Sequence, residues 1–369
     1  MERAKPRVNA LPLKGVILAN ERTSRLRPLT HLGNRYMLPI ANKPMIFYSL
    51  EYMRRAGIVE VGVVLGPAYS EGIVEAVGDG TGLGLKVTYM HQREPKGVAH
   101  AIGLVKDFAK EDPFIVHYGN VILRDGINSM VEQFTRTHSD AVISLAKVQD
   151  PRAYGVVMTK NRAVVKLVEK PAQPPSNFVL VGTFGFTPVI FQAIRSLKMS
   201  WRGQLEITEA IQCLVDKGCE VGFVEVTDWW TDETLTDLLE ANQFTVRDVE
   251  DSNKGRLEGS VTISGKVGIE EGSVLRGPSS IRGPAIIGKN SEIGPNVYIG
   301  PYTSIGENCV IRGTEIENSI VMNGTRIDCK GQRILDSLIG SYSVITSSRT
   351  AVGEKNRLVL GERTHIDMS

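Results

Sequence analysis

The sequence lacks any marked excess of charge of one sign, and it lacks long apolar runs. Lys and Arg total 43 against 41 Asp and Glu among 369 residues, which leaves a formal net charge of +2. A basic field large enough to attract nucleic acid is therefore not expected. No apolar run approaches the ~18 residues of a membrane-spanning helix, and the start, MERAKPRVNALPLKG, lacks the apolar core of a signal peptide. These absences predict a cytoplasmic protein without nucleic-acid or membrane partners.

Cysteine is scarce as well. The four cysteines, Cys213, Cys219, Cys309 and Cys329, are scattered and show no metal-ligand spacing. We interpret them as free thiols in a reducing compartment. No Ser, His and Asp residues show the spacing of a catalytic triad, so the sequence does not indicate nucleophilic catalysis.

The first two thirds of the chain alternate between strand-like and helical patterns. Buried strands are predicted at 15–19 and 61–65, separated by a helix at 44–56. Three more strands are predicted at 86–89, 114–117 and 141–148, and two more helices at 99–108 and 127–137. This alternation predicts an α/β fold with an open, mostly parallel, doubly wound sheet. Ligands bind beyond the carboxyl ends of such strands, which here means 20–25 and 118–121.

The last third carries a hexapeptide repeat. Nine aliphatic residues follow one another at intervals of six, namely Ile263, Ile269, Leu275, Ile281, Ile287, Ile293, Ile299, Ile305 and Ile311. A period of six is typical of a left-handed parallel β-helix, whereas a β-sandwich would show a period of two. Beyond residue 317 the register breaks, with a further coil or two expected. The predicted organisation is a flexible tail at 1–12, an α/β domain at 13–249, a linker at 250–258 and a β-helix at 259–369, whose last segment from 347 folds back as a cap.

Several motifs together resemble one enzyme family. They include RLRPLT at 25–30, LPIANKP at 38–44, EPKGVAHA at 94–101, VEKPAQPPSN at 168–177 and WRGQLEIT at 201–208. With them the chain resembles the sugar-1-phosphate nucleotidylyltransferases, most closely the long form of glucose-1-phosphate thymidylyltransferase. The resemblance implies an enzyme that joins a nucleoside triphosphate to a sugar 1-phosphate with Mg²⁺ and releases pyrophosphate.

The family's phosphate-binding loop, usually GGxGTRL, has no glycine in this chain. The corresponding residues are Asn20, Glu21, Arg22, Thr23, Ser24, Arg25 and Leu26. Glycine permits the positive φ and the close backbone approach that a phosphate cradle demands. A Glu21 carboxylate beside a triphosphate would add repulsion of ~4 kcal/mol per contact at ~4 Å and an effective dielectric of ~20. The loop is thus predicted to bind triphosphate poorly.

The residues that the resemblance assigns to metal and catalysis are altered too. Asn120 replaces the aspartate of a GD motif, and Arg35 replaces a lysine. Asp232 remains, so we expect it to be the one residual, weak metal ligand. Arg25, Arg35 and Asp232 are the candidate catalytic residues that are left. An amide oxygen is a poorer Mg²⁺ ligand than a carboxylate, and arginine is not equivalent to lysine.

The residues that the resemblance assigns to the base and the sugar phosphate are retained. They are Gln92, Gly97, Tyr154, Gly155, Glu169, Lys170, Gly182, Arg202 and Glu206. Glu169 and Lys170 can also be a simple ion pair in a surface turn. His117 ends a strand near Asn120 and faces the expected metal site, so it is a candidate proton carrier for altered chemistry. His100 is interpreted as structural.

Two functional hypotheses follow. The first is a degenerate family member that binds a sugar or cyclitol phosphate without a cofactor, either regulating an active paralogue or repurposed to another reaction. The second is an active, Mg²⁺-dependent nucleotidylyltransferase with a dTTP-like substrate and altered use of Arg22, Arg35 and Asp232. Acyl transfer on the β-helix is disfavoured because residues 259–348 contain no histidine. Homo-oligomerisation through the coils is the expected role of that domain.

Overall fold

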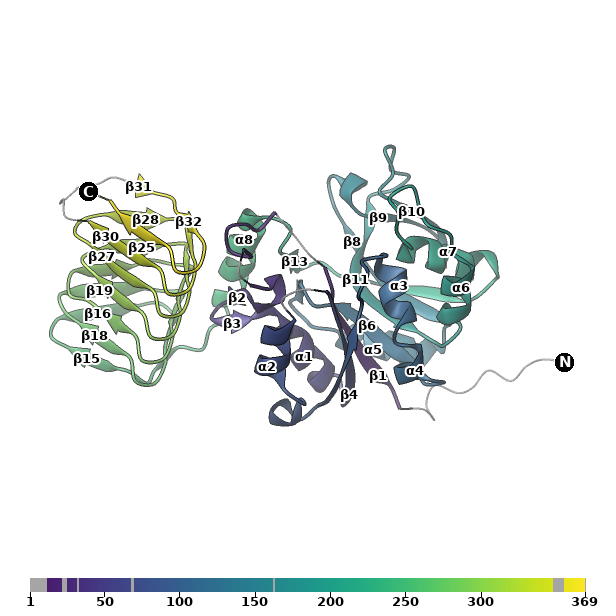
Figure 1. Ribbon diagram of the computed structural model, residues 1–369, viewed down its shortest axis with the longest axis horizontal. Helices are drawn as coiled ribbons and strands as arrows, with labels where there is room; N and C mark the ends of the chain where they lie inside the picture. Colours follow the sequence, from purple (N-terminus) through teal and green to yellow (C-terminus); the bar gives the residue numbers. More distant parts are fainter. Residues whose placement is uncertain are drawn as a thin grey trace. The chain divides into compact units, whose positions relative to one another are not determined.

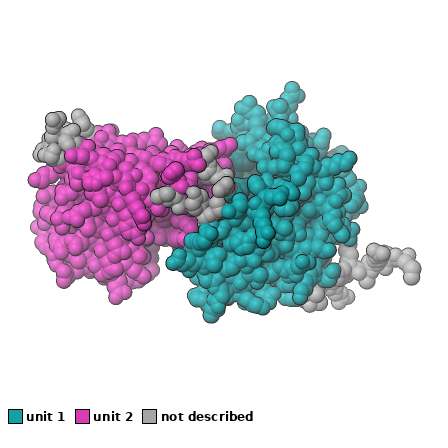
Figure 2. Space-filling model, viewed as in Figure 1, with its two compact units in different colours: residues 1–22, 46–229 teal, residues 23–45, 230–369 magenta. Residues whose placement is uncertain are grey.

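The computed structural model describes residues 12–21, 25–31, 33–67, 70–161, 163–347 and 355–368. The chain forms two compact units (Figure 2). The first, here called the α/β unit, comprises Met1–Arg22 and Ile46–Trp229. The second, the β-helix unit, comprises Thr23–Met45 and Trp230–Ser369. The segment Thr23–Met45 therefore groups with the C-terminal part of the chain. The expected division at residue 249 places this segment in the α/β domain.

The α/β unit is built on a mixed nine-stranded sheet (Figure 1). Its strands are β1 (Lys14–Ala19), β4 (Glu60–Leu65), β5 (Lys86–His91), β6 (Phe114–Tyr118), β8 (Ala141–Lys147), β9 (Gly155–Lys160), β10 (Ala163–Glu169), β11 (Phe178–Phe186) and β12 (Val221–Glu225). The path runs β10-β9-β11-β6-β1-β4-β5, and β8 joins β11 to β12. Strands β6, β1, β4 and β5 are mutually parallel, as the alternating pattern predicts.

Part of this sheet is antiparallel. Strand β11 runs antiparallel to β6, β8 and β9, and β9 and β10 form an antiparallel pair. Strands β9 and β10 end and begin at Lys160 and Ala163, so the connection between them is short. A short connection permits only an antiparallel neighbour, because a parallel one needs a crossover of a dozen or more residues.

Helices cover the sheet of the α/β unit. They are α1 (Met45–Arg55), α2 (Glu71–Val77), α3 (Val98–Gly103), α4 (Lys106–Ala109), α5 (Asn128–Thr137), α6 (Ile190–Ser196) and α7 (Ile207–Asp216). Helices α3, α6 and α7 pack together, and α7 also lies against β10. Their apolar faces join the strands in one core that includes Val16, Val116, Ile143, Phe184 and Ile211. The single helix expected at 99–108 is interrupted between α3 and α4.

The β-helix unit stacks three parallel sheets around a column of aliphatic side chains. One sheet contains β14 (Ser252–Asn253), β17 (Val267–Ile269), β20 (Ala285–Ile287), β23 (Thr303–Ile305), β26 (Ile320–Val321), β29 (Leu338–Ile339) and β32 (Val359–Leu360). The second contains β15 (Arg256–Glu258), β18 (Val274–Arg276), β21 (Glu292–Ile293), β24 (Val310–Arg312), β27 (Arg326–Cys329), β30 (Val344–Ser347) and β33 (His365–Asp367). The third contains β16 (Val261–Ser264), β19 (Ser279–Arg282), β22 (Val297–Ile299), β25 (Glu315–Glu317), β28 (Arg333–Leu335) and β31 (Lys355–Asn356).

The hexapeptide residues occupy the positions that the repeat predicts. Ile263 pairs with Ile281 and Ile281 with Ile299, while Leu275 pairs with Ile293 on another sheet. Three intervals of six thus make one coil, and each inward side chain stacks on its counterpart in the next coil. From Leu275 onward these residues are fully buried in the shared core. The prediction of a left-handed β-helix is confirmed.

The two ends of the β-helix differ from expectation. The predicted linker at 250–258 contains β14 and β15, which pair with β17 and β18 and so belong to the first coil. The predicted C-terminal cap does not fold back within its described part, because β31, β32 and β33 add in parallel to β28, β29 and β30. Strands of two or three residues are too short to show a periodic pattern. Residues 348–354 lie outside the described residues.

Helix α8 (Leu235–Val246) ties the segment before α1 to the β-helix. The fully buried Asn242 accepts hydrogen bonds from the backbone N–H of Ala41 (2.9 Å) and the hydroxyl of Ser304 (3.0 Å). Its side-chain nitrogen donates to the carbonyl of Tyr302 (3.0 Å). Ala41 lies in the hairpin of β2 (Pro39–Ile40) and β3 (Lys43–Pro44). This junction explains why the segment around Arg35 groups with the β-helix.

Candidate active site

The sequence-predicted site residues are divided between the two units. Arg25, Arg35 and Asp232 belong to the β-helix unit. Most of the others belong to the α/β unit, including the described loop residues Asn20 and Glu21. Arg22, Thr23 and Ser24 of the predicted altered loop lie outside the described residues. Three groups of contacts result, one in the β-helix unit and two in the α/β unit.

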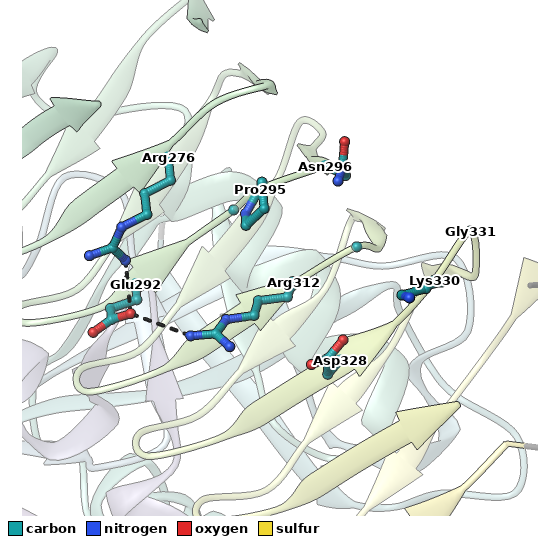
Figure 3. A pocket seen from close by; sticks show the side chains of 10 residues that line it. Arg276, Glu292, Pro295, Asn296, Arg312, Asp328, Lys330 and Gly331 are labelled. Carbon is teal, nitrogen blue, oxygen red and sulfur yellow. Dashed lines mark hydrogen bonds and ion pairs between the residues drawn. The ribbon is translucent and has the colours of Figure 1, made fainter. Parts of the chain in front are cut away.

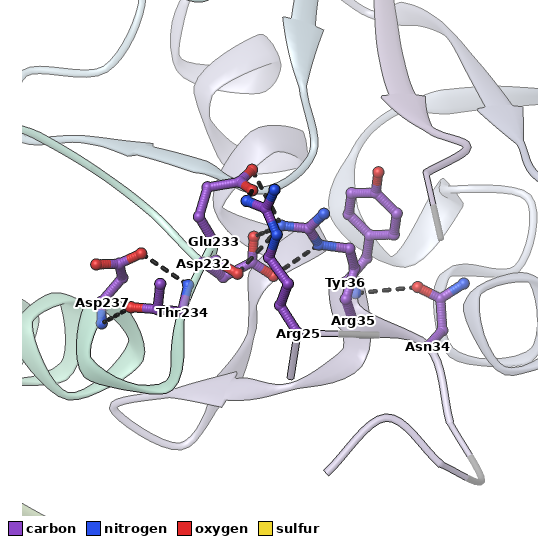
Figure 4. A network of polar contacts seen from close by, with 8 residues as sticks. All are labelled: Arg25, Asn34, Arg35, Tyr36, Asp232, Glu233, Thr234 and Asp237. Carbon is purple, nitrogen blue, oxygen red and sulfur yellow. Dashed lines mark hydrogen bonds and ion pairs between the residues drawn. The ribbon is translucent and has the colours of Figure 1, made fainter. Parts of the chain in front are cut away.

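In the β-helix unit, Arg35 and Asp232 form a buried, two-pronged ion pair (Figure 4). The Nε of Arg35 donates to Oδ2 of Asp232 at 2.9 Å, and its Nη2 donates to Oδ1 of the same carboxylate. Nη2 also donates to the backbone oxygen of Asp232 at 3.1 Å. The Arg35 side chain is 3% exposed and that of Asp232 is 0% exposed. A planar guanidinium matches a carboxylate in this way, whereas a lysine ammonium would meet it as a point charge.

This ion pair decides how well the residues suit the Mg²⁺ that the resemblance implies. Both carboxylate oxygens of Asp232 already accept from Arg35. A divalent cation at Asp232 would have to displace a buried guanidinium and then stand beside its positive charge. Asn120, in the α/β unit, offers an uncharged amide oxygen where Mg²⁺ prefers carboxylates. As arranged in the described residues, Asp232 and Asn120 do not fit a magnesium ion.

The residues after Asp232 are also fixed. The Oε2 of Glu233 lies 3.2 Å from Nη1 of Arg25, whose side chain is 70% exposed. Thr234 and Asp237 form a capping box at the start of α8, in which each side chain accepts from the other residue's backbone N–H (Figure 4). A capping box stabilises a helix start, so the chain two residues after Asp232 is fixed at the start of α8.

Arg35 itself is positioned by a short turn. The Asn34 side chain caps the 3-10 helix Arg35–Met37 by accepting from the backbone N–H of Tyr36 at 3.0 Å. Tyr36 is 1% exposed, which anchors this turn in the interior. In this turn Asn34 therefore provides the cap, Arg35 provides the cation that pairs with Asp232, and the buried Tyr36 holds the turn in the interior.

In the α/β unit, Asn20 and Gln92 form a second group. The Nδ2 of Asn20 donates to Oε1 of Gln92. The Nε2 of Gln92 donates to the backbone oxygen of Gly97 (3.0 Å) and contacts Nδ1 of His100 (2.8 Å). Both amide hydrogens of Gln92 are thus in use, and Gln92 is 1% exposed. A nucleobase could gain a donor from Gln92 only by breaking one of these bonds.

Two features around this group explain the residues at Gly97 and His100. Gly97 has a φ of +100°, and a Cβ there would meet the carbonyl of Leu205 at 2.6 Å. Only glycine fits that position. Burial and the nearby Lys96 lower the pKa of His100, which favours the neutral ring. Because the Nε2 of Gln92 only donates, Nδ1 of His100 is the acceptor in their contact. The interpretation of His100 as a structural residue agrees with this contact.

His117 and Asn120 lie at and after the end of β6, as predicted. His117 is 0% exposed, and burial lowers its pKa to about 4. Its Nδ1 contacts the hydroxyl of Thr183 at 2.8 Å, and its Nε2 contacts the carbonyl of Val121 at 3.1 Å. Because a carbonyl only accepts, Nε2 carries the proton and Nδ1 accepts from Thr183. These contacts and the lowered pKa place His117 in the core and do not support the predicted proton carrier. Asn120 is 4% exposed.

The third group is the expected sugar-phosphate side. Nη1 of Arg202 lies 3.1 Å from Oε1 of Glu169 and 3.3 Å from Oε1 of Glu206. Thr208 donates to Oε2 of Glu169 at 3.1 Å, and Ser200 donates to Oε1 of Glu206 at 2.9 Å. The pKa of Glu169 is raised, chiefly by burial and then by the Glu206 charge. The guanidinium of Arg202 thus forms ion pairs with the carboxylates of both Glu169 and Glu206.

The backbone around this group also explains the retained glycines. Gly155 pairs with Glu169 across β9 and β10, and a Cβ on it would meet the Thr208 methyl at 2.6 Å. Gly182 has a φ of +63°, and a Cβ there would meet the Tyr118 ring at 2.6 Å. Tyr154 meets Trp229 edge to face at 5.9 Å between ring centres.

The structure separates Glu169 from its sequence neighbour Lys170. Glu169 points into the Arg202 group, while Lys170 is exposed and has a φ of +41°. The alternative of a simple Glu169–Lys170 surface pair is therefore not what the structure describes. Ser200 and Thr208 belong to this group and were absent from the predicted residues, although Thr208 ends the motif WRGQLEIT. Their hydroxyls gave no signal by themselves because Ser and Thr are common in loops and helix starts.

A separate cavity of about 670 Å³ lies on the β-helix and is lined by none of the predicted site residues (Figure 3). Arg276 reaches Glu258 at 3.0 Å and Glu292 at 2.9 Å, and Arg312 lies 3.8 Å from Glu292. These side chains come from successive coils of one sheet. The charges on this face are therefore paired along the stack.

No helix in the described part of the chain is long and apolar enough to cross a membrane. Within the same residues, all four cysteines are free thiols. Burial raises the pKa of the Cys309 and Cys329 thiols to about 11.

Comparison with known proteins gives two matching family models. Residues 14–248 match the model described as Nucleotidyl transferase, and residues 281–369 match the GMPPB C-terminal domain. The chain is 40% identical to the low-salt glycan biosynthesis nucleotidyltransferase Agl11 of Haloferax volcanii, over 96% of this chain and 100% of that protein. It is also 40% identical to the glucose-1-phosphate thymidylyltransferase of Streptomyces griseus, over 97% of this chain and 100% of that protein.

One solved structure extends the likeness. A putative glucose-1-phosphate thymidylyltransferase from Bacillus anthracis, in complex with a sucrose, has a TM-score of 0.61 and 32% sequence identity. The match covers 65% of this chain and 98% of the Bacillus anthracis chain. The match of the Nucleotidyl transferase family over residues 14–248 and the full-length relatives agree with the family resemblance of the motifs. The chain therefore belongs to the nucleotidyl transferase family, as a member of its sugar-1-phosphate nucleotidylyltransferases.

Proposed function

We propose that this protein binds a phosphorylated sugar or cyclitol but does not carry out metal-dependent nucleotidyl transfer at ordinary rates. The observation that carries the proposal is the buried ion pair of Arg35 and Asp232, which occupies both oxygens of the expected metal ligand. Asn120, Asn20 and Glu21 act in the same direction, since each replaces a residue that the family uses for metal or triphosphate. Cytoplasmic location, self-association and pairing with an active paralogue are further parts of the proposal.

The retained sugar side supports binding without that reaction. Glu169, Arg202 and Glu206 hold one another in place before any ligand arrives, which lowers the cost of ordering them on binding. The exposed Lys170 offers a cation for a phosphate. Regulation of an active paralogue and a new reaction in the same site are the two uses compatible with this division.

A second candidate is an active nucleotidylyltransferase that joins a nucleoside triphosphate to glucose 1-phosphate or a related sugar phosphate. It is favoured by the two relatives that are 40% identical over their whole length and are named as nucleotidyltransferases. In this candidate Arg35 would have to release Asp232 when substrates bind, and Mg²⁺ would be required. Pyrophosphate release separates the two candidates.

Thermal stabilisation tests the binding half of the proposal. A ligand that binds only the folded state raises its stability by RT ln(1 + [L]/Kd). Glucose 1-phosphate is expected to raise the melting temperature, and dTTP or UTP with Mg²⁺ to leave it unchanged. Lys170→Gln should abolish the rise, while Lys166→Gln, an exposed lysine on the preceding strand β10, should not. Equal stabilisation by the nucleotides would refute the proposal.

A further inference from the structure

A cavity of about 450 Å³ opens on the α/β unit, where β10 passes the start of α7. Its lining includes Leu167, Glu169, Trp201, Glu206, Glu209 and Gln212. Two of these, Glu169 and Glu206, also belong to the Arg202 group, so the cavity adjoins the expected sugar-phosphate side. The rest of the lining comes from β10, from α7 with the residue after it, and from the turn before α7. The family resemblance did not assign these residues to any ligand.

Trp201 stands at this cavity with its indole in solvent. It is 87% exposed, more than any other large apolar side chain among the described residues. An indole is costly to leave in water, because full burial of a large apolar side chain is worth about 2–3 kcal/mol. A ring left exposed beside a cavity is a ready contact surface for a ligand that covers it.

The turn that carries Trp201 is rigidly bonded. The backbone N–H of Ser200 donates to the carbonyl of Gln204 at 2.8 Å, and that of Gly203 donates to the carbonyl of Ser200 at 2.8 Å. The Ser200 hydroxyl donates to Glu206 and accepts from the backbone N–H of Arg202 at 3.2 Å. The backbone under the indole is therefore set before any ligand binds, which favours binding.

The charges around the cavity indicate what kind of ligand it takes. Four carboxylates line it, those of Glu169, Glu206, Glu209 and Asp216, against the single lining ammonium of Lys217. The guanidinium of Arg202 offsets part of this excess by bridging Glu169 and Glu206. A phosphate would meet net repulsion here, while hydroxyl groups would find acceptors and an ammonium group would find opposite charge.

Aromatic faces and carboxylates together favour a saccharide ring. The apolar C–H face of a pyranose can lie on an indole while its hydroxyls donate to surrounding acceptors. An amino substituent would gain cation–π attraction to Trp201 and charge attraction to Glu209. The amide of Gln212 is already fixed, with its oxygen accepting from the backbone N–H of Leu167 at 2.7 Å and its nitrogen donating to Asp216 at 2.7 Å.

We propose that this cavity is a saccharide subsite that stacks an unphosphorylated pyranose ring on Trp201 and prefers one with an amino substituent, through Glu209. The subsite deepens the proposed function, since it adjoins the expected sugar-phosphate side. It assigns that side an acceptor-rich extension for the part of the ligand that carries no phosphate.

Tryptophan fluorescence and calorimetry of the full chain test the subsite. The probes are glucosamine, glucose and inorganic phosphate. Glucosamine is expected to change the emission saturably in the millimolar range, glucose more weakly, and phosphate not at all. Trp201→Ala should weaken glucosamine binding about tenfold, within the range of a stacking and cation–π contact, and Trp201→Phe should retain most of it. Both substitutions are at an exposed side chain, and unchanged melting temperatures will verify folding.

A second variant tests the charge argument. Glu209 is exposed and makes no part of the Arg202 group, so Glu209→Gln should fold normally. It is expected to remove the preference for glucosamine over glucose, because the loss of charge weakens glucosamine binding more than glucose binding. Lys198→Gln, an exposed lysine outside the lining, is the matched control and should change neither.

The outcomes separate this inference from the proposed function. Equal affinity of the wild type and Trp201→Ala for glucosamine, or no saturable signal with either sugar, overturns the subsite and leaves Trp201 as a protein-contact residue instead. Neither result depends on a phosphorylated ligand. Stabilisation by nucleotides, or pyrophosphate release, would refute the proposed function without touching the glucosamine result.

Discussion

At the residue scale, the proposal depends most on Arg35, which stands where the family resemblance implies a lysine. A lysine can approach one carboxylate oxygen and leave the other, but the guanidinium takes both oxygens of Asp232. The pair is fully enclosed, so its members depend on each other far more than surface charges do. Ion pairs of this kind are held by mutual attraction that offsets a large desolvation cost.

Removing one partner of this pair should therefore be severe. Arg35→Ala leaves the carboxylate of Asp232 buried without its cation, and we expect a loss of about 3–5 kcal/mol in the free energy of unfolding. The matched control is Arg25→Ala, which breaks an exposed pair with Glu233 and should cost less than about 1 kcal/mol. Denaturant unfolding measures both. Equal costs for the two variants would contradict the buried pair.

His117 gives a prediction in pH. Burial lowers its pKa from 6.5 to about 4. Between these two pH values the His117 imidazole is mostly protonated in the unfolded chain and mostly neutral in the folded chain. Stability from this group is present above pH 6.5 and is lost as the pH falls to about 4, in total about 3 kcal/mol. His117→Gln cannot take up that proton. The stability difference between wild type and variant should shrink over this range, and a constant difference would contradict the assignment.

At the element scale, one asparagine holds three segments together. Asn242 on α8 bonds to the hairpin at Ala41 and to the coil at Tyr302 and Ser304. The segment that carries Arg35 is thereby tied to the β-helix rather than to the sheet that precedes it in the sequence. The β-helix thus positions a candidate catalytic residue as well as serving any role in assembly.

Replacing this asparagine should loosen the junction. Asn242→Leu leaves a buried backbone N–H, a carbonyl and a hydroxyl without their partner, and the expected cost is about 3 kcal/mol. Its neighbour Gln243 makes one partly buried bond to Asn318 at 2.7 Å, so Gln243→Ala should cost about 1 kcal/mol or less. Thermal unfolding of the two variants compares them. A Gln243→Ala variant as unstable as Asn242→Leu would contradict the role assigned to Asn242.

The elements also show what sequence could and could not predict. Repeats such as Ile263, Ile281 and Ile299 are visible in the sequence because each coil repeats the same inward aliphatic residue. The last coil is not visible in the sequence, because its residues pair at a longer spacing than those of the first coils. Ile334 pairs with Asn356, and Ile339 pairs with Leu360. A change in loop length and a polar residue in the inward row together remove the periodic signal.

The site follows the same rule. Motifs located Arg202, Glu206 and Glu169, because residue type and spacing survive there. The pairing of Arg35 with Asp232 could not be predicted, since the two are 197 positions apart and only the fold brings them together. The bond between Asn20 and Gln92, 72 positions apart, is another such case. The family resemblance implied that Asn20 and Arg35 are replacements, and the structure gives the partners that these two side chains contact.

At the scale of the whole molecule, the two units carry different groups of the residues that the family resemblance assigns to the site. The α/β unit retains a connected set of sugar-side contacts, and the β-helix unit carries the neutralised Asp232. The full-length relatives show that this architecture accompanies nucleotidyltransferases. The proposed loss of transfer with retained sugar binding rests on the buried Arg35–Asp232 pair and on the contacts of Arg202 with Glu169 and Glu206.

Restoring the replaced residues tests whether they are the cause. The variant combines Asn20→Gly, Glu21→Gly and Thr23→Gly with Asn120→Asp and Arg35→Lys. It is expected to gain thermal stabilisation by dTTP or UTP with Mg²⁺, because glycine reopens the phosphate cradle and lysine releases one oxygen of Asp232. A control with Arg35→Lys alone should gain little. If dTTP and UTP with Mg²⁺ still do not raise the melting temperature of the combined variant, these five residues do not explain the expected lack of nucleotide binding.

The most direct test of the central claim is pyrophosphate release by the wild-type protein, with glucose 1-phosphate, Mg²⁺ and each common nucleoside triphosphate in turn. The account predicts no turnover above background, because Asp232 is held by Arg35. Turnover at ordinary enzyme rates, about 1 per second or faster, with any of these nucleotides would contradict it.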